Sequence, residues 1–336
     1  MDSLAADALT ETKLAAIADH ASLGVHRIPM PRVLGAGDLT APLRIRRLAK
    51  HLGIDVVHGH GAKGGFYGRL ARIGCKTRVA IYTPHGGVLH YSRNSPSGRL
   101  FLGLEALLMA YTDAVIFESA YAQSTYAEVI GHPDCRQVIV HNGLAATEFE
   151  PVPSVPDAHD FAFVGELREI KGIDVLLDAL SDLRRPDGHP ATLIMAGDGP
   201  SREALEEQIA RLGLGERVEL AGVRPAREVF ARGRCVVVPS RAESLPYIVL
   251  EAVGAQKPLI ATAVGGVAEI FGPTSDALVA PGDADALERS MTAFLDDPGA
   301  ADRAMRERFT FVAERFTLDR MVSQIEETYF QALEDR

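Results

Sequence analysis

Two glutamates that could bind hydroxyl groups, Glu243 and Glu251, stand eight residues apart after a short apolar stretch that is expected to form a strand. Ligands of open parallel sheets bind outside the carboxyl ends of the strands, and one carboxylate can accept hydrogen bonds from both hydroxyls of a sugar diol. A helix is expected over residues 247–254, so the backbone N–H groups of Ser244, Leu245 and the first helical turn suit a diphosphate. Each glutamate alone is more simply a solvated surface charge, but the neighbouring motifs favour a binding site.

Cations and glycines follow other expected strands in the same half of the chain. Arg168 and Lys171 come just after a strand expected over 160–164. Such cations suit a departing diphosphate, because they neutralise the negative charge that grows on it. Glycines that let a backbone approach a ligand closely are Gly165, Gly197, Gly265 and Gly266. Solvated surface charges and tight strand-to-helix turns are the alternative interpretations.

Histidines follow two expected strands in the first half of the chain. His85 precedes Gly86 and Gly87 at one strand end, and His58 and His60 lie at the end of another. His58 and His60 could bind a metal ion in principle, but no third ligand is evident. An isolated histidine is more often structural, so His58 and His60 are interpreted as loop and cleft-wall residues.

The composition excludes several classes of protein. A length of 336 residues suggests two domains, and 47% apolar with 24% charged residues is typical of a globular chain. The net charge of −10 argues against a generic nucleic-acid-binding protein, and three scattered cysteines are too few for a disulfide framework or a zinc site. The most apolar stretch is interrupted by Glu105 and Asp113, which argues against a membrane-spanning helix. Asp2 and Asp7 stand where a signal peptide would carry basic residues, so we expect a cytoplasmic protein.

The order of the expected elements predicts an α/β fold. Short apolar runs alternate with helical patterns in both halves, which is typical of βαβ units with parallel sheets. Strands are expected at 54–58, 77–82, 113–117, 137–140, 160–164, 192–196, 218–220, 235–238, 258–261 and 277–279, and the chain ends in helices at 287–295, 301–314 and 317–333. Three prolines in residues 150–157 predict a linker. The first 150 residues carry 15 basic and 13 acidic residues and the rest carry 20 and 32, which also favours two domains.

The motifs of the second half together resemble the donor half of a family 4 retaining glycosyltransferase with the GT-B fold. The Glu-(seven residues)-Glu spacing of 243–251, the Gly-Gly-x-x-Glu-Ile of 265–270 and the Gly-x-Leu-x-x-x-Lys-Gly of 165–172 occur in the family's order. The resemblance is strong over 160–280 and looser elsewhere, including His141-Asn-Gly-Leu144.

The resemblance implies roles for the residues that match the motifs. Glu251 would hold the ribose of a nucleotide-diphosphate sugar, Glu243 the transferred sugar, and Arg168 and Lys171 the diphosphate. Many members have an arginine where this chain has Glu166, so Arg168 would take over that role. His85, in a Thr-x-His-Gly turn, would face the donor sugar.

The resemblance also implies the domain organisation. Residues 1–150 would form an acceptor-side Rossmann-like domain with His60 and Gly86 on its acceptor side. Residues 151–316 would form the donor-binding domain across a cleft, and residues 317–336 a helix that packs back toward the first domain. Because a helix is expected over 5–20 where the family opens with a strand and a Gly-rich turn, we expect the first domain to lack its opening strands.

The implied activity is metal-independent, retaining hexosyl transfer to a hydroxyl of a glycan or lipid-linked acceptor, with no cofactor and no nucleic-acid partner. The stretch 82–102 resembles a subgroup that makes bacterial exopolysaccharide or other cell-envelope glycans. Two alternatives stay open: a GT-B epimerase that acts on the donor alone, and an inactive nucleotide-sugar-binding protein. The basic stretch 44–51 would suit the anionic inner face of a membrane, although a solvated helix face is the simpler interpretation.

Overall fold

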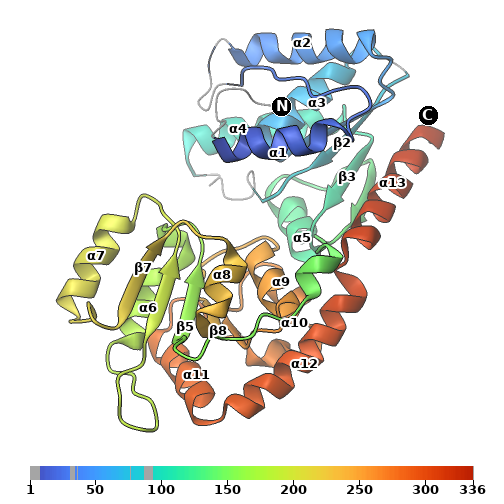
Figure 1. Cartoon of the computed structure of the whole chain (residues 1–336). Coiled ribbons are helices and arrows are strands. Elements are labelled where there is room, and N and C mark those ends of the chain that lie inside the picture. Colours follow the sequence, from blue (N-terminus) through green and yellow to red (C-terminus); the bar gives the residue numbers. More distant parts are fainter. Residues whose placement is uncertain (1–7, 31–34, 36, 76, 87–93, 336) are drawn as a thin grey trace. The chain divides into compact units, whose positions relative to one another are not determined.

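The computed structural model describes residues 8–30, 35, 37–75, 77–86 and 94–335. The chain divides into two compact units (Figure 1). The first consists of Met1–Phe117, Gln123–Ile139 and Ile325–Arg336, and the second of Glu118–Ala122 and Val140–Gln324. The chain therefore enters the second unit at Glu118, returns to the first at Gln123, and enters the second again at Val140. Residues 5–7 of the first expected helix, and Gly87, lie outside the described residues.

The first unit is built on a parallel four-stranded sheet with the strand order β1-β2-β3-β4. The strands are β1 (Val56–His60), β2 (Val79–Thr83), β3 (Ala114–Phe117) and β4 (Arg136–Ile139), and the helices are α1 (Ala8–Ala18), α2 (Gly37–His51), α3 (Gly61–Arg72), α4 (Pro96–Met109) and α5 (Ala120–Val129). Every residue of β2 and β3 is buried, because central strands of a parallel sheet are covered on both faces. The outer strands β1 and β4 are partly exposed.

A buried ion pair connects the helices of the first unit with its sheet. Arg69 of α3 is 1% exposed and donates to both carboxylate oxygens of Glu105 on α4, at 2.8 and 2.7 Å. Tyr126 of α5 donates its hydroxyl to the same carboxylate at 2.8 Å, and the guanidinium lies 4.0 Å from the centre of the Tyr82 ring on β2. Both charges therefore have partners, as buried charges require.

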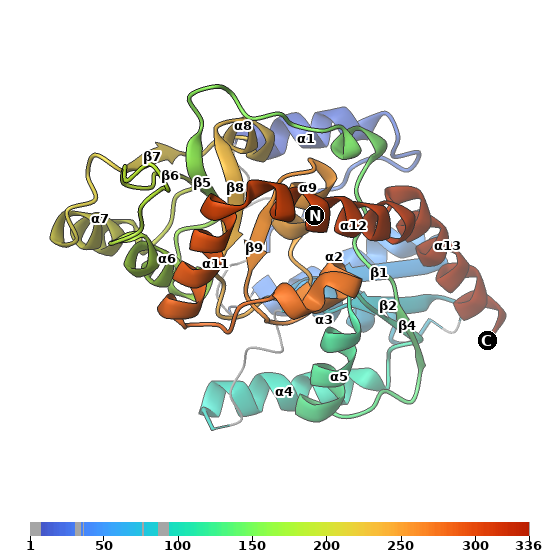
Figure 2. The same cartoon turned by 90° about the horizontal axis from the view of Figure 1, so that it is seen from below.

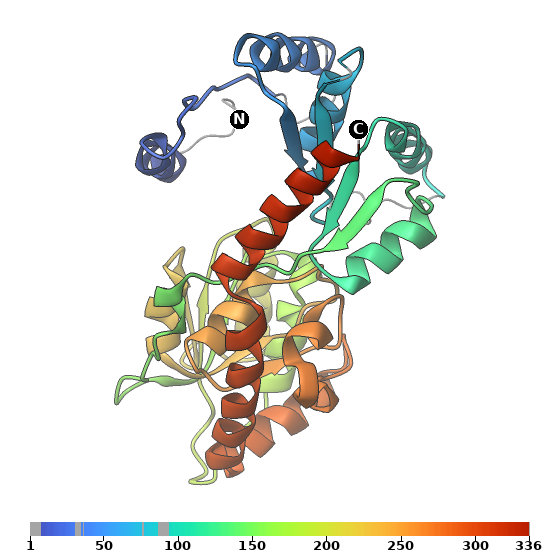
Figure 3. The same ribbon diagram turned by 90° about the vertical axis from the view of Figure 1, so that its right-hand side faces the viewer.

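The second unit contains a parallel five-stranded sheet with the strand order β7-β6-β5-β8-β9. Its strands are β5 (His159–Val164), β6 (Leu193–Ala196), β7 (Val218–Gly222), β8 (Gly233–Val238) and β9 (Leu259–Ala261). Its helices are η1 (Ala146–Phe149), η2 (Glu169–Lys171), α6 (Ile173–Leu180), α7 (Arg202–Arg211), α8 (Ala226–Ala231), α9 (Tyr247–Gly254), α10 (Val267–Phe271), η3 (Gly272–Ala277), α11 (Ala284–Asp296), α12 (Pro298–Arg315) and the first part of α13 (Leu318–Glu334). In Figure 2, α11 lies near the edge strand β9, and α12 packs against α9 and η3. Figure 3 shows α13 as one uninterrupted helix.

The strand expected over 277–279 is reduced to a single bridge. Val279 pairs in parallel with Thr262 just after β9, through backbone hydrogen bonds from Val279 to Ala261 and from Ala263 to Val279. The preceding residues are taken up by η3, which continues to Ala277, so too few extended residues remain for a full strand.

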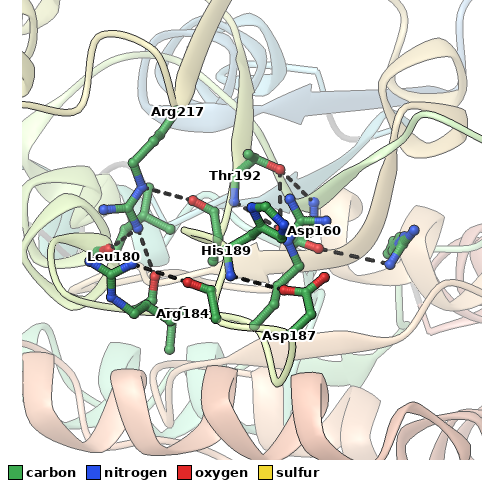
Figure 4. A network of polar contacts seen from close by, with 12 residues as sticks. Asp160, Leu180, Arg184, Asp187, His189, Thr192 and Arg217 are labelled. Atoms are coloured by element: carbon green, nitrogen blue, oxygen red, sulfur yellow. Dashed lines mark hydrogen bonds and ion pairs between the residues drawn. The ribbon is translucent and has the colours of Figure 1, made fainter.

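Arg217 holds the segment between α6 and β6 (Figure 4). Its guanidinium donates to the carbonyl oxygens of Leu180, Ser181, Leu183 and Ala191 at 2.6–2.9 Å. Arg217 thereby connects the backbone at the end of α6 with the backbone just before β6.

The buried Asp160, at the start of β5, fixes the end of the same segment (Figure 4). Its carboxylate accepts hydrogen bonds from the backbone N–H and the hydroxyl of Thr192, and Arg185 and Arg234 lie 3.5 and 3.9 Å away. The start of β6 is therefore anchored to β5 by side chains as well as by the sheet.

Lys257 is a buried cation without a carboxylate partner in the described part of the chain. It precedes β9, is 3% exposed, and donates to the Ser154 hydroxyl at 2.6 Å. Burial lowers the pKa of Lys257 to about 8. A lysine in the unfolded chain has a pKa of about 10.4, so the unfolded state binds more protons between these values and the charged lysine opposes folding at neutral pH.

We therefore expect Lys257→Met to raise the free energy of unfolding at pH 7 by about 3 kcal/mol. The gain should shrink as pH rises above 8 and disappear near pH 10.5, where the lysine is neutral in both states. Urea unfolding at pH 7 and pH 10 measures it, with the exposed Lys50→Met as the matched control. A gain that does not change with pH, or a loss at pH 7, would contradict the expectation.

Candidate functional site

The loops that follow β5, β6, β8 and β9 carry the motifs of the second unit. Because the sheet is parallel, all four loops leave at the same edge. The backbone N–H of Gly165 donates to Ala196 at 3.0 Å, and a Cβ atom on Gly197 would lie 1.8 Å from the Gly165 carbonyl oxygen. Gly197 also has a φ of 147°. A glycine is therefore required for the close contact between the loops after β5 and β6.

Lys171 and Glu243 form an ion pair at this edge. Lys171 ends η2 after β5, and its Nζ lies 2.6 Å from Oε1 of Glu243 in the loop after β8. Ser240 donates its hydroxyl to the same oxygen at 2.7 Å. The lysine side chain is 25% exposed and the glutamate 10%. A cation and a hydroxyl-binding carboxylate thus lie side by side, and an anionic ligand could compete with Glu243 for the ammonium group.

Arg168 does not join this pair. Its side chain is 54% exposed and its nearest carboxylate is that of Glu166 at 3.5 Å, itself 55% exposed. Such an exposed pair contributes little to stability. The structure therefore brings together two of the predicted charged residues, Lys171 and Glu243, and leaves Arg168 in solvent.

The loop of residues 243–245 is supported from behind by the turn after β9. Gly265 has a φ of 55°, and a Cβ atom there would lie 1.8 Å from the carbonyl oxygen of Glu243. The N–H of Gly266 donates to the Ser244 carbonyl at 2.6 Å. Leu245 is 4% exposed and belongs to the apolar core. These contacts fix the backbone that carries Glu243.

Glu251 lies on α9, and no contact among the described residues connects it to Glu243. Burial, and then the nearby Glu148 carboxylate, raise the pKa of Glu251. Its carboxylate has no hydrogen bond within the part of the chain that the structure describes, so its oxygens have capacity to accept ligand hydroxyl groups.

Three histidines and two hydroxyls form a second cluster, in the first unit. Nδ1 of His60 lies 2.9 Å from Nε2 of His85, which adopts a φ of 51°. His58 lies 2.7 Å from the Tyr329 hydroxyl and 2.8 Å from the Thr83 hydroxyl. The ring centres of His58 and His60 are 4.1 Å apart. Gly86, with a φ of 71°, follows His85.

His58 and His60 resist protonation, because both rings are largely buried. Burial lowers the pKa of His58 to about 3, with smaller effects from His60 and His85, and burial also lowers the pKa of His60. A neutral imidazole has one donor and one acceptor nitrogen, so the chain of contacts orients each ring. No described group of three His, Cys, Asp or Glu side chains is arranged to hold a metal ion.

Several polar contacts that support the candidate site were not predicted from the sequence. Ser240 contacts Glu243, Asn142 donates to the Leu245 carbonyl at 3.1 Å, and Ser244 donates its hydroxyl to Glu118. Glu269 accepts from the N–H groups of Ala120 and Tyr121 and pairs with His141 at 3.0 Å. Ser240 follows a strand end three residues before Glu243, so its contact with Glu243 could have been predicted from this spacing. The other contacts join residues that are distant in the sequence, so the sequence does not indicate them.

Comparison with known proteins identifies the family. The family described as "Glycosyl transferases group 1" matches residues 146–310, and "Glycosyl transferase 4-like domain" matches residues 6–143. An uncharacterised glycosyltransferase of Methanocaldococcus jannaschii is 30% identical over 258 residues, which cover 73% of this chain and 67% of the relative. The chain belongs to the glycosyltransferases.

Other relatives are similar over part of their length. The alpha-D-kanosaminyltransferase of Streptomyces kanamyceticus is 31% identical over 175 residues, which cover 50% of this chain and 44% of that enzyme. The chain thus spans less than half of that relative. The crystal structure of Anabaena HepE in complex with UDP has a TM-score of 0.78 at 21% identity, covering 97% of this chain and 90% of HepE. The predicted α/β GT-B fold class is confirmed.

We expect Gly265→Ala to displace the loop that carries Glu243. A left-handed alanine costs about 1 kcal/mol, and the overlap with the Glu243 carbonyl adds about 1–3 kcal/mol. Gly282→Ala is a matched control, because Gly282 has a φ of 78° with no atom within 4 Å of the added Cβ. Thermal unfolding should show a larger loss for Gly265→Ala. Equal losses would show that the contact with Glu243 is unimportant.

Proposed function

We propose that the glycosyltransferase described above moves a sugar from a nucleotide-diphosphate sugar to an acceptor hydroxyl. The observation that carries this proposal is the pairing of Lys171 with Glu243 where the loops after two parallel strands meet. An ammonium group that can bind a diphosphate stands directly beside a carboxylate that can bind sugar hydroxyls.

In the proposed reaction the donor diphosphate displaces Glu243 from Lys171. The freed carboxylate, still held by Ser240, accepts hydrogen bonds from hydroxyl groups of the sugar. As the bond between the sugar C1 and the diphosphate breaks, Lys171 stabilises the charge on the leaving oxygen. The acceptor oxygen forms the new bond to C1 on the same face, and its proton passes to the departing diphosphate. The donor configuration is retained and no metal ion takes part.

We assign the ribose hydroxyls to Glu251, whose partly buried carboxylate has no hydrogen bond among the described residues. Backbone at Ser244, Leu245, Gly165, Gly197, Gly265 and Gly266 would line the donor. His85, with His60 and Gly86, would face the sugar and the acceptor. Arg168 would have to leave solvent to reach the diphosphate, so we expect it to contribute less than Lys171.

We further propose a role in assembling polysaccharide or cell-envelope glycans at a membrane surface. Arg44, Arg46, Arg47 and Lys50 on α2 are exposed, with Leu43 beside them at 52% exposure. This arrangement suits attraction to anionic lipid headgroups. Among the described residues, no helix is both long and apolar enough to cross a membrane.

The test is release of nucleotide diphosphate from UDP-, GDP- and ADP-sugars, with and without added acceptor sugars. Lys171→Met and Glu243→Gln should each lower kcat/KM by about a hundredfold or more, since each removes a charge that acts on the reacting groups. Arg211→Met, a change at an exposed cation of α7, should leave it unchanged. Full activity of Lys171→Met would overturn the site assignment.

Three further readouts separate the alternatives. NMR of the product reports the anomeric configuration, which we expect to match the donor. Activity should persist in EDTA. A changed sugar formed without acceptor would indicate the epimerase, and donor binding without turnover would indicate the inactive binding protein.

A further inference from the structure

A second buried cation of the second unit, Arg308 on α12, has no carboxylate partner among the described residues. The residue is 2% exposed. Its Nε donates to the Thr274 hydroxyl at 2.9 Å, and its guanidinium lies 3.7 Å from the centre of the Phe271 ring. Neither terminal nitrogen makes a hydrogen bond or an ion pair within the described part of the chain. The four N–H groups of the terminal nitrogens therefore have no protein partner among the described residues.

Such an arrangement is costly for the free protein. Removing a charge from water without a counter-ion is strongly unfavourable. Burial lowers the pKa of Arg308 to about 10, only partly opposed by Cys235 and Glu307. The guanidinium nevertheless keeps its proton at neutral pH. The first unit provides a contrast, because the equally buried Arg69 has a two-pronged partner in Glu105.

Arg308 lines a cavity of about 590 Å³ beside the edge strand β9. The other walls come from β8, the segment after η3, α11 and α12, and they are dominated by alanines together with Leu259, Ile260 and Phe294. The size is within the usual range for small-ligand sites of about 300–1,000 Å³. The cavity therefore offers an apolar interior with one buried cation in its wall.

The remaining charges of the cavity do not neutralise Arg308. Asp297 caps α12 by accepting from the Ala300 N–H at 3.0 Å, and its other oxygen lies 3.6 Å from Arg303. Asp276 is exposed and makes no ion pair with Arg308. Arg289, also exposed, adds a second positive charge at the rim.

We infer that this cavity binds a carboxylate carried on an aliphatic chain, with the carboxylate on Arg308 and the chain against the alanine-rich walls. A guanidinium offers parallel N–H donors that match the two oxygens of a carboxylate. Burying the aliphatic chain against these walls adds a hydrophobic contribution to binding. The site is separate from the candidate donor site, since none of Lys171, Glu243 or Ser240 lines it.

Calorimetric titration of the whole protein with octanoate, 1-octanol and inorganic phosphate tests the inference. Octanoate should bind saturably at one site and raise the unfolding temperature, since it binds the folded state. Octanol lacks the charge and phosphate lacks the chain, so each should bind at least tenfold more weakly. No saturable octanoate binding up to 10 mM, or equal binding of phosphate or octanol, would overturn the proposal.

Variants locate the site. Arg308→Met should weaken octanoate binding at least tenfold, whereas Arg306→Met, an exposed arginine of the same helix, should not change it. If Arg308→Met fails to fold, Ala304→Phe tests the location of the site instead. Ala304 lines the cavity one helical turn before Arg308, so the larger side chain should block the ligand and keep the cation. Unchanged binding in the folded variant would refute the assignment.

Discussion

The second sheet is parallel throughout, and this constraint determines where its chemistry can occur. All loops after its strands leave at one edge, so Lys171 after β5 and Glu243 after β8 meet although 72 residues separate them. The close backbone contacts at Gly197 and Gly265 exist because four loops share a narrow edge. The carboxylate that binds Lys171 is thus oriented by the sheet and by backbone packing, with Ser240 as its local support.

The buried cations of the described chain differ in how far their charge is compensated. In the first, Arg69 is matched by Glu105 and the Tyr126 hydroxyl, so its charge contributes to packing. In the second, Lys257 has a hydroxyl partner and Arg308 has a hydroxyl and an aromatic face. Uncompensated charge lowers the stability of the free protein and creates capacity for anions. Paired and unpaired buried cations are therefore physically distinct features, although the sequence alone does not distinguish Arg69, Lys257 and Arg308 from exposed basic residues.

Most strands could be predicted from the sequence, because buried parallel strands are short apolar runs between turn signals. The strand at 277–279 failed because three apolar residues also fit the end of a 3-10 helix followed by one bridge. Glu243 and Lys171 could be identified by motif and spacing. The carboxylate of Glu118 behind Ser244 and the hydroxyl of Tyr329 beside His58 could not, since these contacts join residues 126 and 271 positions apart. Arg168 was predicted to bind the diphosphate together with Lys171. The spacing of these two cations in the sequence does not indicate which of them is exposed to solvent.

The interleaving of the two units has a consequence for synthesis of the chain. The chain passes between them four times, and Ile325–Arg336 returns to the first unit. His58 acquires its Tyr329 partner only after almost the whole chain has left the ribosome. The first unit must therefore persist in an incomplete state during translation, whereas the second can assemble from a nearly continuous stretch. Neither unit is one continuous segment of the chain. Recombination that exchanges the first unit between relatives would therefore have to transfer the C-terminal residues together with the first 139 residues.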